Sequence, residues 1–126
     1  MVMVGHLMDK RIDKTYPASL SKPHIQTLKN HLNYNGLIIT DDLNMGALYS
    51  VSKNKAKIAT IAARAGNHLL LFEYLTFDDI KRISQAIERA SEKNESLNHH
   101  IVDSTKRINQ ALLFGSQFGG NAVRYF

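Results

Sequence analysis

Two adjacent carboxylates, Asp41 and Asp42, follow the apolar run 37–39 and Thr40, and they are the sharpest chemical feature of the sequence. A charge at the end of a buried strand is costly to desolvate, so such a pair usually has a purpose. One carboxylate would suit a nucleophile or a general base. The pair would also suit Mg²⁺ in a protein that handles phosphate. Alternatively, it caps the following turn through Asx hydrogen bonds, and the spacing alone leaves the three interpretations open.

A second catalytic group must come from elsewhere in the chain. Successive strand residues point to opposite faces, so Asp41 and Asp42 cannot form an acid/base couple. His6 and the 73–74 region also fall at the ends of expected strands, where parallel α/β proteins place their sites. His6 would point into the same site as Asp41 or would satisfy a structural hydrogen bond. His68 stands at the start of a strand, and we expect it to be structural.

The sequence contains no arrangement that is typical of a bound metal or cofactor. His99 and His100 are adjacent on an expected helix and do not share a face, which makes them a poor metal pair. There is no HExxH motif and no glycine-rich phosphate loop. We therefore expect neither a metal nor a cofactor.

Three apolar runs are predicted to be strands, at 2–6, 37–40 and 68–72. None of them alternates polar with apolar residues, which is typical of parallel strands that are buried on both faces. Helical patterns separate and follow the runs, in the order β-loop-α-β-α-β-α-α. This alternation predicts an α/β fold with parallel strands and right-handed crossovers.

The first two helices are marked by their ends. Ser21 can cap a helix over 21–32, with Pro23 in the first turn, where its missing N–H is tolerated. The second helix covers 53–65 and stops at Gly66.

The last two helices have similar signals. Thr76 and Asp79 resemble a capping box at the start of the third helix. The fourth spans 97–114 and ends at Gly115, and residues 116–126 are predicted to form a loose tail. The expected buried faces of the four helices, in chain order, consist of Ile25, Leu28 and Leu32; Ile58, Ile61, Ala62 and Ala65; Ile80, Ile83, Ile87 and Ala90; and Leu97, Ile101, Ile108 and Leu112.

The composition narrows the function classes. The 126 residues suit one domain, with 16 Lys and Arg against 11 Asp and Glu, a net charge of +5 and no cysteine. The basic residues are scattered, with 53–57 the densest run, and they do not alternate with aromatic residues, so we expect no nucleic-acid partner. No apolar run approaches the ~20 residues of a membrane span. Without cysteines or a signal-peptide pattern, we expect a cytoplasmic location.

Five segments together resemble the family 3 glycoside hydrolases, and most closely the single-domain bacterial β-N-acetylhexosaminidases that recycle peptidoglycan. The segment 36–45, Gly-Leu-Ile-Ile-Thr-Asp-Asp-Leu-Asn-Met, resembles the family signature around the catalytic nucleophile. Segments 2–6, 17–21 and 65–71 and the Arg-Ile pair at 107–108 also resemble family segments. The resemblance extends to about residue 113.

This resemblance implies a retaining glycosidase that releases terminal β-N-acetylglucosamine from a carbohydrate substrate. Asp41 would be the nucleophile that forms a glycosyl-enzyme intermediate. His6 would lie near the sugar, and Asp42 and Met45 would shape the floor of the substrate pocket.

The resemblance also implies that residues 1–126 are the C-terminal fragment of a (β/α)8 TIM barrel, comprising about its last three βα units and a C-terminal helix. The family's Lys-His-Phe-Pro-Gly segment and its Asp-x-His acid/base dyad have no counterpart here, and His68 stands where the family normally has Asp.

We therefore expect activity only when an upstream barrel fragment is supplied, and self-association of the isolated chain through its open sheet edges. The alternatives are an inactive remnant of a split gene, or a small α/β domain that binds Mg²⁺ and phosphate.

Overall fold

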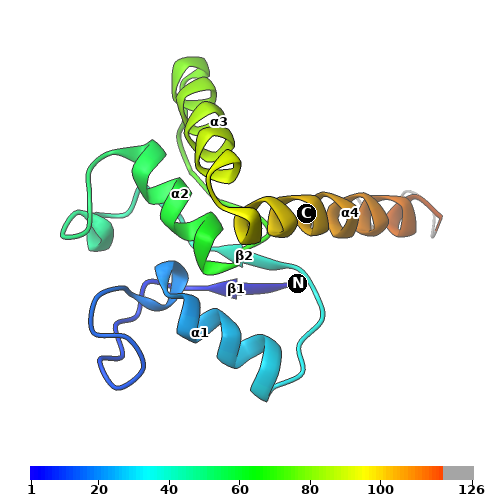
Figure 1. Cartoon of the computed structure of the whole chain (residues 1–126), viewed down its shortest axis with the longest axis horizontal. Coiled ribbons are helices and arrows are strands. Elements are labelled where there is room, and N and C mark those ends of the chain that lie inside the picture. The colour runs from blue at the N-terminus through cyan, green and yellow to red at the C-terminus, as the bar shows by residue number, and fades with distance from the viewer. Residues whose placement is uncertain (118–126) are drawn as a thin grey trace.

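The chain folds as a mixed α/β unit, as the sequence predicts. The computed structural model describes residues 1–117 (Figure 1). The predicted tail at 118–126 lies outside the described residues, whereas Ser116 and Gln117 continue the last helix instead of starting a tail. In chain order, the elements are β1 (Val2–Val4), the 3₁₀ turn η1 (Ala18–Leu20), α1 (Lys22–Gln26), the π turn η2 (Thr27–His31), β2 (Ile38–Thr40), the 3₁₀ turn η3 (Gly46–Leu48), α2 (Lys55–Ala65), α3 (Phe77–Glu92) and α4 (Glu95–Gln117).

Strands β1 and β2 pair in parallel, as predicted, with Val2 opposite Ile38 and Val4 opposite Thr40. The two strands are shorter than the runs 2–6 and 37–40 that predict them. Ile38 and Thr40 are fully buried beneath the helices, whereas Met3, on the opposite face of the sheet, is 55% exposed. The expectation of a sheet buried on both faces is therefore met on one face only.

The prediction of a third strand over 68–72 is wrong. This segment makes one parallel bridge, between Leu69 and Ile39. The carbonyl of Ile38 accepts from both His68 N and Leu69 N, at 2.9 and 3.1 Å. Leu71 N then donates to the hydroxyl of Thr40, at 3.0 Å, instead of to a backbone carbonyl. Side chains thus replace regular ladder bonds, although the segment runs parallel to β2.

Helix α1 begins as predicted and ends early. Ser21 caps it by accepting from His24 N at 3.3 Å, and Pro23 lies in the first turn. The chain then widens into the π turn η2, where Leu32 N donates to Thr27 O. The wider turn rotates the end of the segment, and Leu32 is 70% exposed instead of buried.

Helix α2 begins at Lys55 instead of at residue 53, because Asn54 caps it by accepting from Lys57 N at 3.0 Å. Its end is as predicted, with Gly66 in the left-handed region at φ 110°. Ala62 on its buried face is inaccessible to solvent.

Helices α3 and α4 differ from prediction at their exposed ends. Thr76 and Asp79 form the expected capping box of α3, but Ile80 is exposed and Ile83 supplies the buried contact. Helix α4 continues through Gly115, where an end was predicted, and it projects from the body of the molecule (Figure 1). Leu112 is consequently exposed instead of buried. Within residues 1–117, no helix combines the length and the apolar character that crossing a membrane requires.

The core has two parts that hold the sheet from one side. The larger cluster lies between the loops after the strands and α2, and its buried members are Leu20, Leu43, Leu48, Ile58 and Ala62. The smaller cluster joins α1, β2 and α2, and its buried members are Ile25, Ile38 and Ala65.

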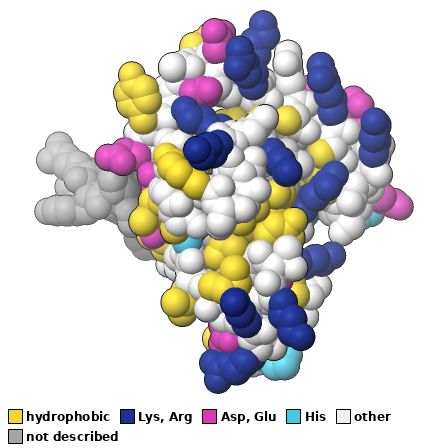
Figure 2. Space-filling view, turned by 90° about the vertical axis from the view of Figure 1, so that its left-hand side faces the viewer, with side chains coloured by type: hydrophobic (Ala, Val, Ile, Leu, Met, Phe, Trp, Pro, Cys, Tyr) yellow, Lys and Arg dark blue, Asp and Glu magenta, His cyan; other side chains and the backbone are white. Residues whose placement is uncertain are grey.

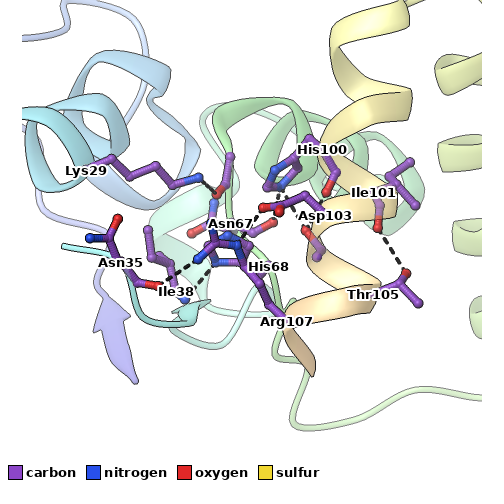
Figure 3. A network of polar contacts seen from close by, with 12 residues as sticks. Lys29, Asn35, Ile38, Asn67, His68, His100, Ile101, Asp103, Thr105 and Arg107 are labelled. Atoms are coloured by element: carbon purple, nitrogen blue, oxygen red, sulfur yellow. Dashed lines mark hydrogen bonds and ion pairs between the residues drawn. The ribbon is translucent and has the colours of Figure 1, made fainter. Parts of the chain in front are cut away.

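Polar contacts fix α4 against the starts of the strands (Figure 3). His100 Nε2 donates to the carbonyl of Asn67 at 2.7 Å, and Arg107 donates to the carbonyl of Asn35 at 2.7 Å. His68 Nδ1 accepts from Ile38 N at 2.9 Å, so the ring proton resides on Nε2. That Nε2 is buried and has no hydrogen-bond partner within the described residues.

Substituting Gly66 with Ala should lower the free energy of unfolding by about 1–2 kcal/mol, because an L-residue is strained at this φ. The added Cβ would also lie 3.2 Å from Ile25 Cγ2. Gly46→Ala is the matched control, since its Cβ meets nothing closer than 3.9 Å. Urea denaturation measures the free energy of unfolding of both variants. Equal stability of Gly66→Ala and the wild type would contradict the left-handed conformation of Gly66.

The protein should lose stability as the pH falls from 6.5 to 4. Burial lowers the pKa of His68 to about 4, and the positive charges of Lys29, His100 and Arg107 contribute to this shift. The negative charge of Asp103 opposes it. Between these pH values the unfolded chain binds a proton that the folded chain does not bind, and the free energy of unfolding should decrease by roughly 3 kcal/mol.

His68→Asn tests this pH dependence, because its amide oxygen can still accept from Ile38 N but does not titrate. Thermal denaturation from pH 4 to 7 should show a shallower pH dependence for this variant. His31→Asn, at an exposed position, should retain the wild-type slope. Identical slopes for all three proteins would show that His68 is not the titrating group.

Candidate active site

The four predicted site residues gather at the carboxyl end of the sheet. Asp41 N donates to Val4 O at 2.9 Å, so the β1–β2 pairing extends to the first carboxylate. This end of the strands lies on the left in Figure 1, and Figure 2 looks onto it. Lys and Arg side chains surround a central group of hydrophobic side chains on this face (Figure 2).

Asp41 is half-buried, and its carboxylate forms few hydrogen bonds with the described residues. Its Oδ1 accepts from the amide of Asp42 at 2.8 Å. No other hydrogen bond to this carboxylate is formed by residues 1–117. A carboxylate with one fixed and one unengaged oxygen at the end of a central strand can act as a nucleophile or a base.

Asp42 performs the turn-capping role that the sequence left open for the pair. Its Oδ1 accepts from Asn44 N at 3.0 Å and from Glu73 N at 2.9 Å. The first bond closes an Asx turn, and the second ties the loop after β2 to the loop after the 68–72 segment. The two adjacent carboxylates therefore have different surroundings.

His6 connects the loop after β1 to the loop after β2. Its Nε2 donates to the carbonyl of Asp42 at 2.8 Å, and its Nδ1, 2.7 Å from the buried hydroxyl of Ser19, then accepts from it. Ser19 O in turn accepts from the side chain of Asn67 at 2.8 Å. Both ring nitrogens of His6 are engaged, which fits the structural interpretation, and the ring contacts the backbone carbonyl of Asp42.

Met45 is 43% exposed, and its backbone N donates to Asp42 O at 3.1 Å. Beside this loop lies a cleft of about 310 Å³, whose walls include Asn44, Tyr49 and Tyr74. Asn44 Nδ2 donates to Tyr74 O at 2.9 Å, and Lys53 Nζ lies 5.8 Å from the centre of the Tyr49 ring. Contact of His6, Asp42 or Met45 with a substrate stays a prediction.

Ser19 and Asn67 support the site, although neither was a predicted site residue. Ser19 lies within the segment 17–21, and Asn67 directly follows Gly66 in the segment 65–71. Both segments resemble the family, but the sequence does not reveal the hydrogen bonds that these two residues form. Within residues 1–117, no group of three or more His, Asp and Glu side chains is placed to hold a metal ion. The Mg²⁺ interpretation of Asp41 and Asp42 therefore has no third His, Asp or Glu ligand within the described residues.

The sequence matches a family model described as the glycosyl hydrolase family 3 N-terminal domain, over residues 1–111. A curated protein from Arthroderma benhamiae, described as an uncharacterized secreted glycosyl hydrolase, is 32% identical over 113 residues. That alignment covers 89% of this chain and 31% of the relative. The chain thus spans about a third of the length of this relative.

Solved structures also resemble this one. A fungal multi-domain GH3 β-N-acetylglucosaminidase superimposes with a TM-score of 0.76 and 27% identity, over 87% of this chain and 13% of the other. A glycosyl hydrolase of the GH3 family from Mycobacterium smegmatis superimposes with a TM-score of 0.74 and 28% identity, over 84% of this chain and 34% of the other.

Asp42→Ala should loosen both loops, because Asn44 N and Glu73 N lose their acceptor. We expect a loss of about 1–3 kcal/mol in the free energy of unfolding and faster amide exchange at Asn44 and Glu73. Asp41→Ala is the internal control and should cost less, since within residues 1–117 Asp41 accepts only from its neighbour. Equal destabilisation by the two substitutions would refute the different roles of the two carboxylates.

Proposed function

Because the chain belongs to glycoside hydrolase family 3, we propose that it supplies the catalytic nucleophile, Asp41, of a retaining β-N-acetylhexosaminidase. The observation that carries the proposal is the contrast between the two adjacent carboxylates. Asp42 is bound by two loop amides, whereas Asp41 accepts only from the next residue and keeps an oxygen unengaged within residues 1–117.

In the proposed reaction, a carboxylate oxygen of Asp41 attacks the anomeric carbon, and the bond to the leaving oxygen breaks. An acid elsewhere in the complete barrel protonates that oxygen. The resulting glycosyl ester on Asp41 is hydrolysed by water, which attacks the anomeric carbon from the opposite face and loses its proton to the same group, now acting as a base. Two inversions restore the original configuration and free Asp41.

The chain acts, in this proposal, as about the last three βα units of a (β/α)8 barrel together with a C-terminal helix. The parallel pairing of β1, β2 and the 68–72 segment supports this assignment, as does the exposed Met3 face, which the other strands would cover. The similarity to a family 3 β-N-acetylglucosaminidase at 27% identity supports N-acetylglucosamine as the sugar. Fragments of peptidoglycan would then be a natural source of the substrate.

Reconstitution tests the proposal. The chain is mixed with a fragment of a family 3 hexosaminidase that carries the preceding strands, and a chromogenic β-N-acetylglucosaminide is assayed. The mixture should hydrolyse the substrate, and Asp41→Ala should reduce the rate at least about a thousandfold, because the covalent route is lost.

Asp78→Ala, which removes an exposed carboxylate of α3, is the matched control and should leave the rate unchanged. Inactivity of every mixture, or undiminished activity with Asp41→Ala, would rule out the proposed role.

A further inference from the structure

A basic cleft opens among the helices, away from the carboxylate pair. It has a volume of about 470 Å³ and lies between α1, the last turn of α2 and the first turn of α4. Its basic side chains are Lys22, Lys29, Arg64 and His100, and Asn94 and Ser96 lie on the α4 side. Within the described part of the chain, no Asp or Glu lines it.

Within the part of the chain that the structure describes, the cations of this cleft have no ion-pair partner. Lys22, Lys29 and Arg64 take part in none of the ion pairs formed within residues 1–117. Lys29 Nζ donates to the carbonyl of Gly66 at 3.1 Å, which occupies one of its three N–H groups. The cleft therefore combines uncompensated positive charge with unused donors.

The neighbouring groups do not cancel this charge. Burial lowers the pKa of Lys29, and the positive charge of Arg107 lowers it further. Asp103 is the acid that acts on Lys29, but Arg107 Nε already donates to it at 2.6 Å. Glu95, in the first turn of α4, lies beside His99 at 3.9 Å and does not line the cleft.

We propose that the basic cleft binds a small ligand that carries phosphate groups, independently of the chemistry proposed for Asp41. Lys supplies a compact charge and Arg a two-pronged donor, the combination that recognises phosphate oxygens. The first turn of the 23-residue helix α4 adds the positive end of its dipole.

The volume of the cleft exceeds what a single phosphate needs, which favours a diphosphate or a phosphorylated sugar. The cleft offers no Phe, Tyr or Trp within residues 1–117 for stacking bases, which argues against nucleic acid.

Calorimetric titration of the 126-residue chain with inorganic pyrophosphate tests the proposal. The wild type should bind with a dissociation constant below about 1 mM. The double variant Lys22→Gln/Arg64→Gln should bind at least about tenfold more weakly, because two exposed cleft cations are lost. Lys81→Gln/Arg89→Gln removes the same charge from the exposed surface of α3 and should change the affinity less than about twofold.

A second readout does not depend on affinity. Burial, Lys29 and Arg107 lower the pKa of His100, and a bound anion at the cleft should raise it, which an NMR titration of the ring protons detects. Glucosamine 6-phosphate identifies the source of the phosphate: tighter binding than pyrophosphate indicates a phosphorylated sugar, and weaker binding indicates a free diphosphate.

Three results with pyrophosphate would overturn the proposal. They are no saturable binding of pyrophosphate up to about 10 mM, equal weakening in the two double variants, and an unchanged pKa of His100 at saturation. Preferential binding of a short single-stranded RNA over pyrophosphate would likewise overturn it, in favour of a nucleic-acid surface.

Discussion

The candidate site depends on the pairing of β2 with a neighbour on each side. Asp41 N binds Val4 O on the β1 side, and Thr40 N binds Leu69 O on the other side. With its backbone held on both sides and its side chains at 38 and 40 buried, the strand has one register, and a slip of one residue would expose those side chains. The position of Asp41 is therefore fixed by the sheet before any loop contributes.

The loops then give the two carboxylates different roles. Asp42 joins the loops after β2 and after the 68–72 segment, and His6 ties the loop after β1 to the same point. Because these bonds use the carboxylate and the carbonyl of Asp42, they join the loops without engaging Asp41, whose Oδ1 alone accepts a hydrogen bond within residues 1–117. This division explains how the nucleophile we propose can be followed directly by a second acid.

Sequence patterns predicted what local chemistry determines and missed what tertiary contacts determine. The cap at Ser21, the stop at Gly66 and the capping box at Thr76 follow from backbone groups within one turn, and all are present. The 68–72 segment is apolar enough for a strand, but the Thr40 hydroxyl takes one of its ladder bonds, which an apolar pattern does not reveal. Likewise, the adjacency of Asp41 and Asp42 was evident, whereas the amide of Glu73, 31 residues beyond Asp42, distinguishes them only in the fold.

We propose that Asp41 becomes covalently bonded to the sugar, and such a bond can be trapped. The mixture of this chain with the fragment that carries the preceding strands would be treated with a slowly hydrolysed fluorinated N-acetylglucosaminide that has a good leaving group, then digested and examined by tandem mass spectrometry. We expect one sugar on the peptide that contains residues 37–45, attached to Asp41. A sugar on Asp42, a sugar on a peptide without Asp41, or turnover with no labelled peptide would contradict it.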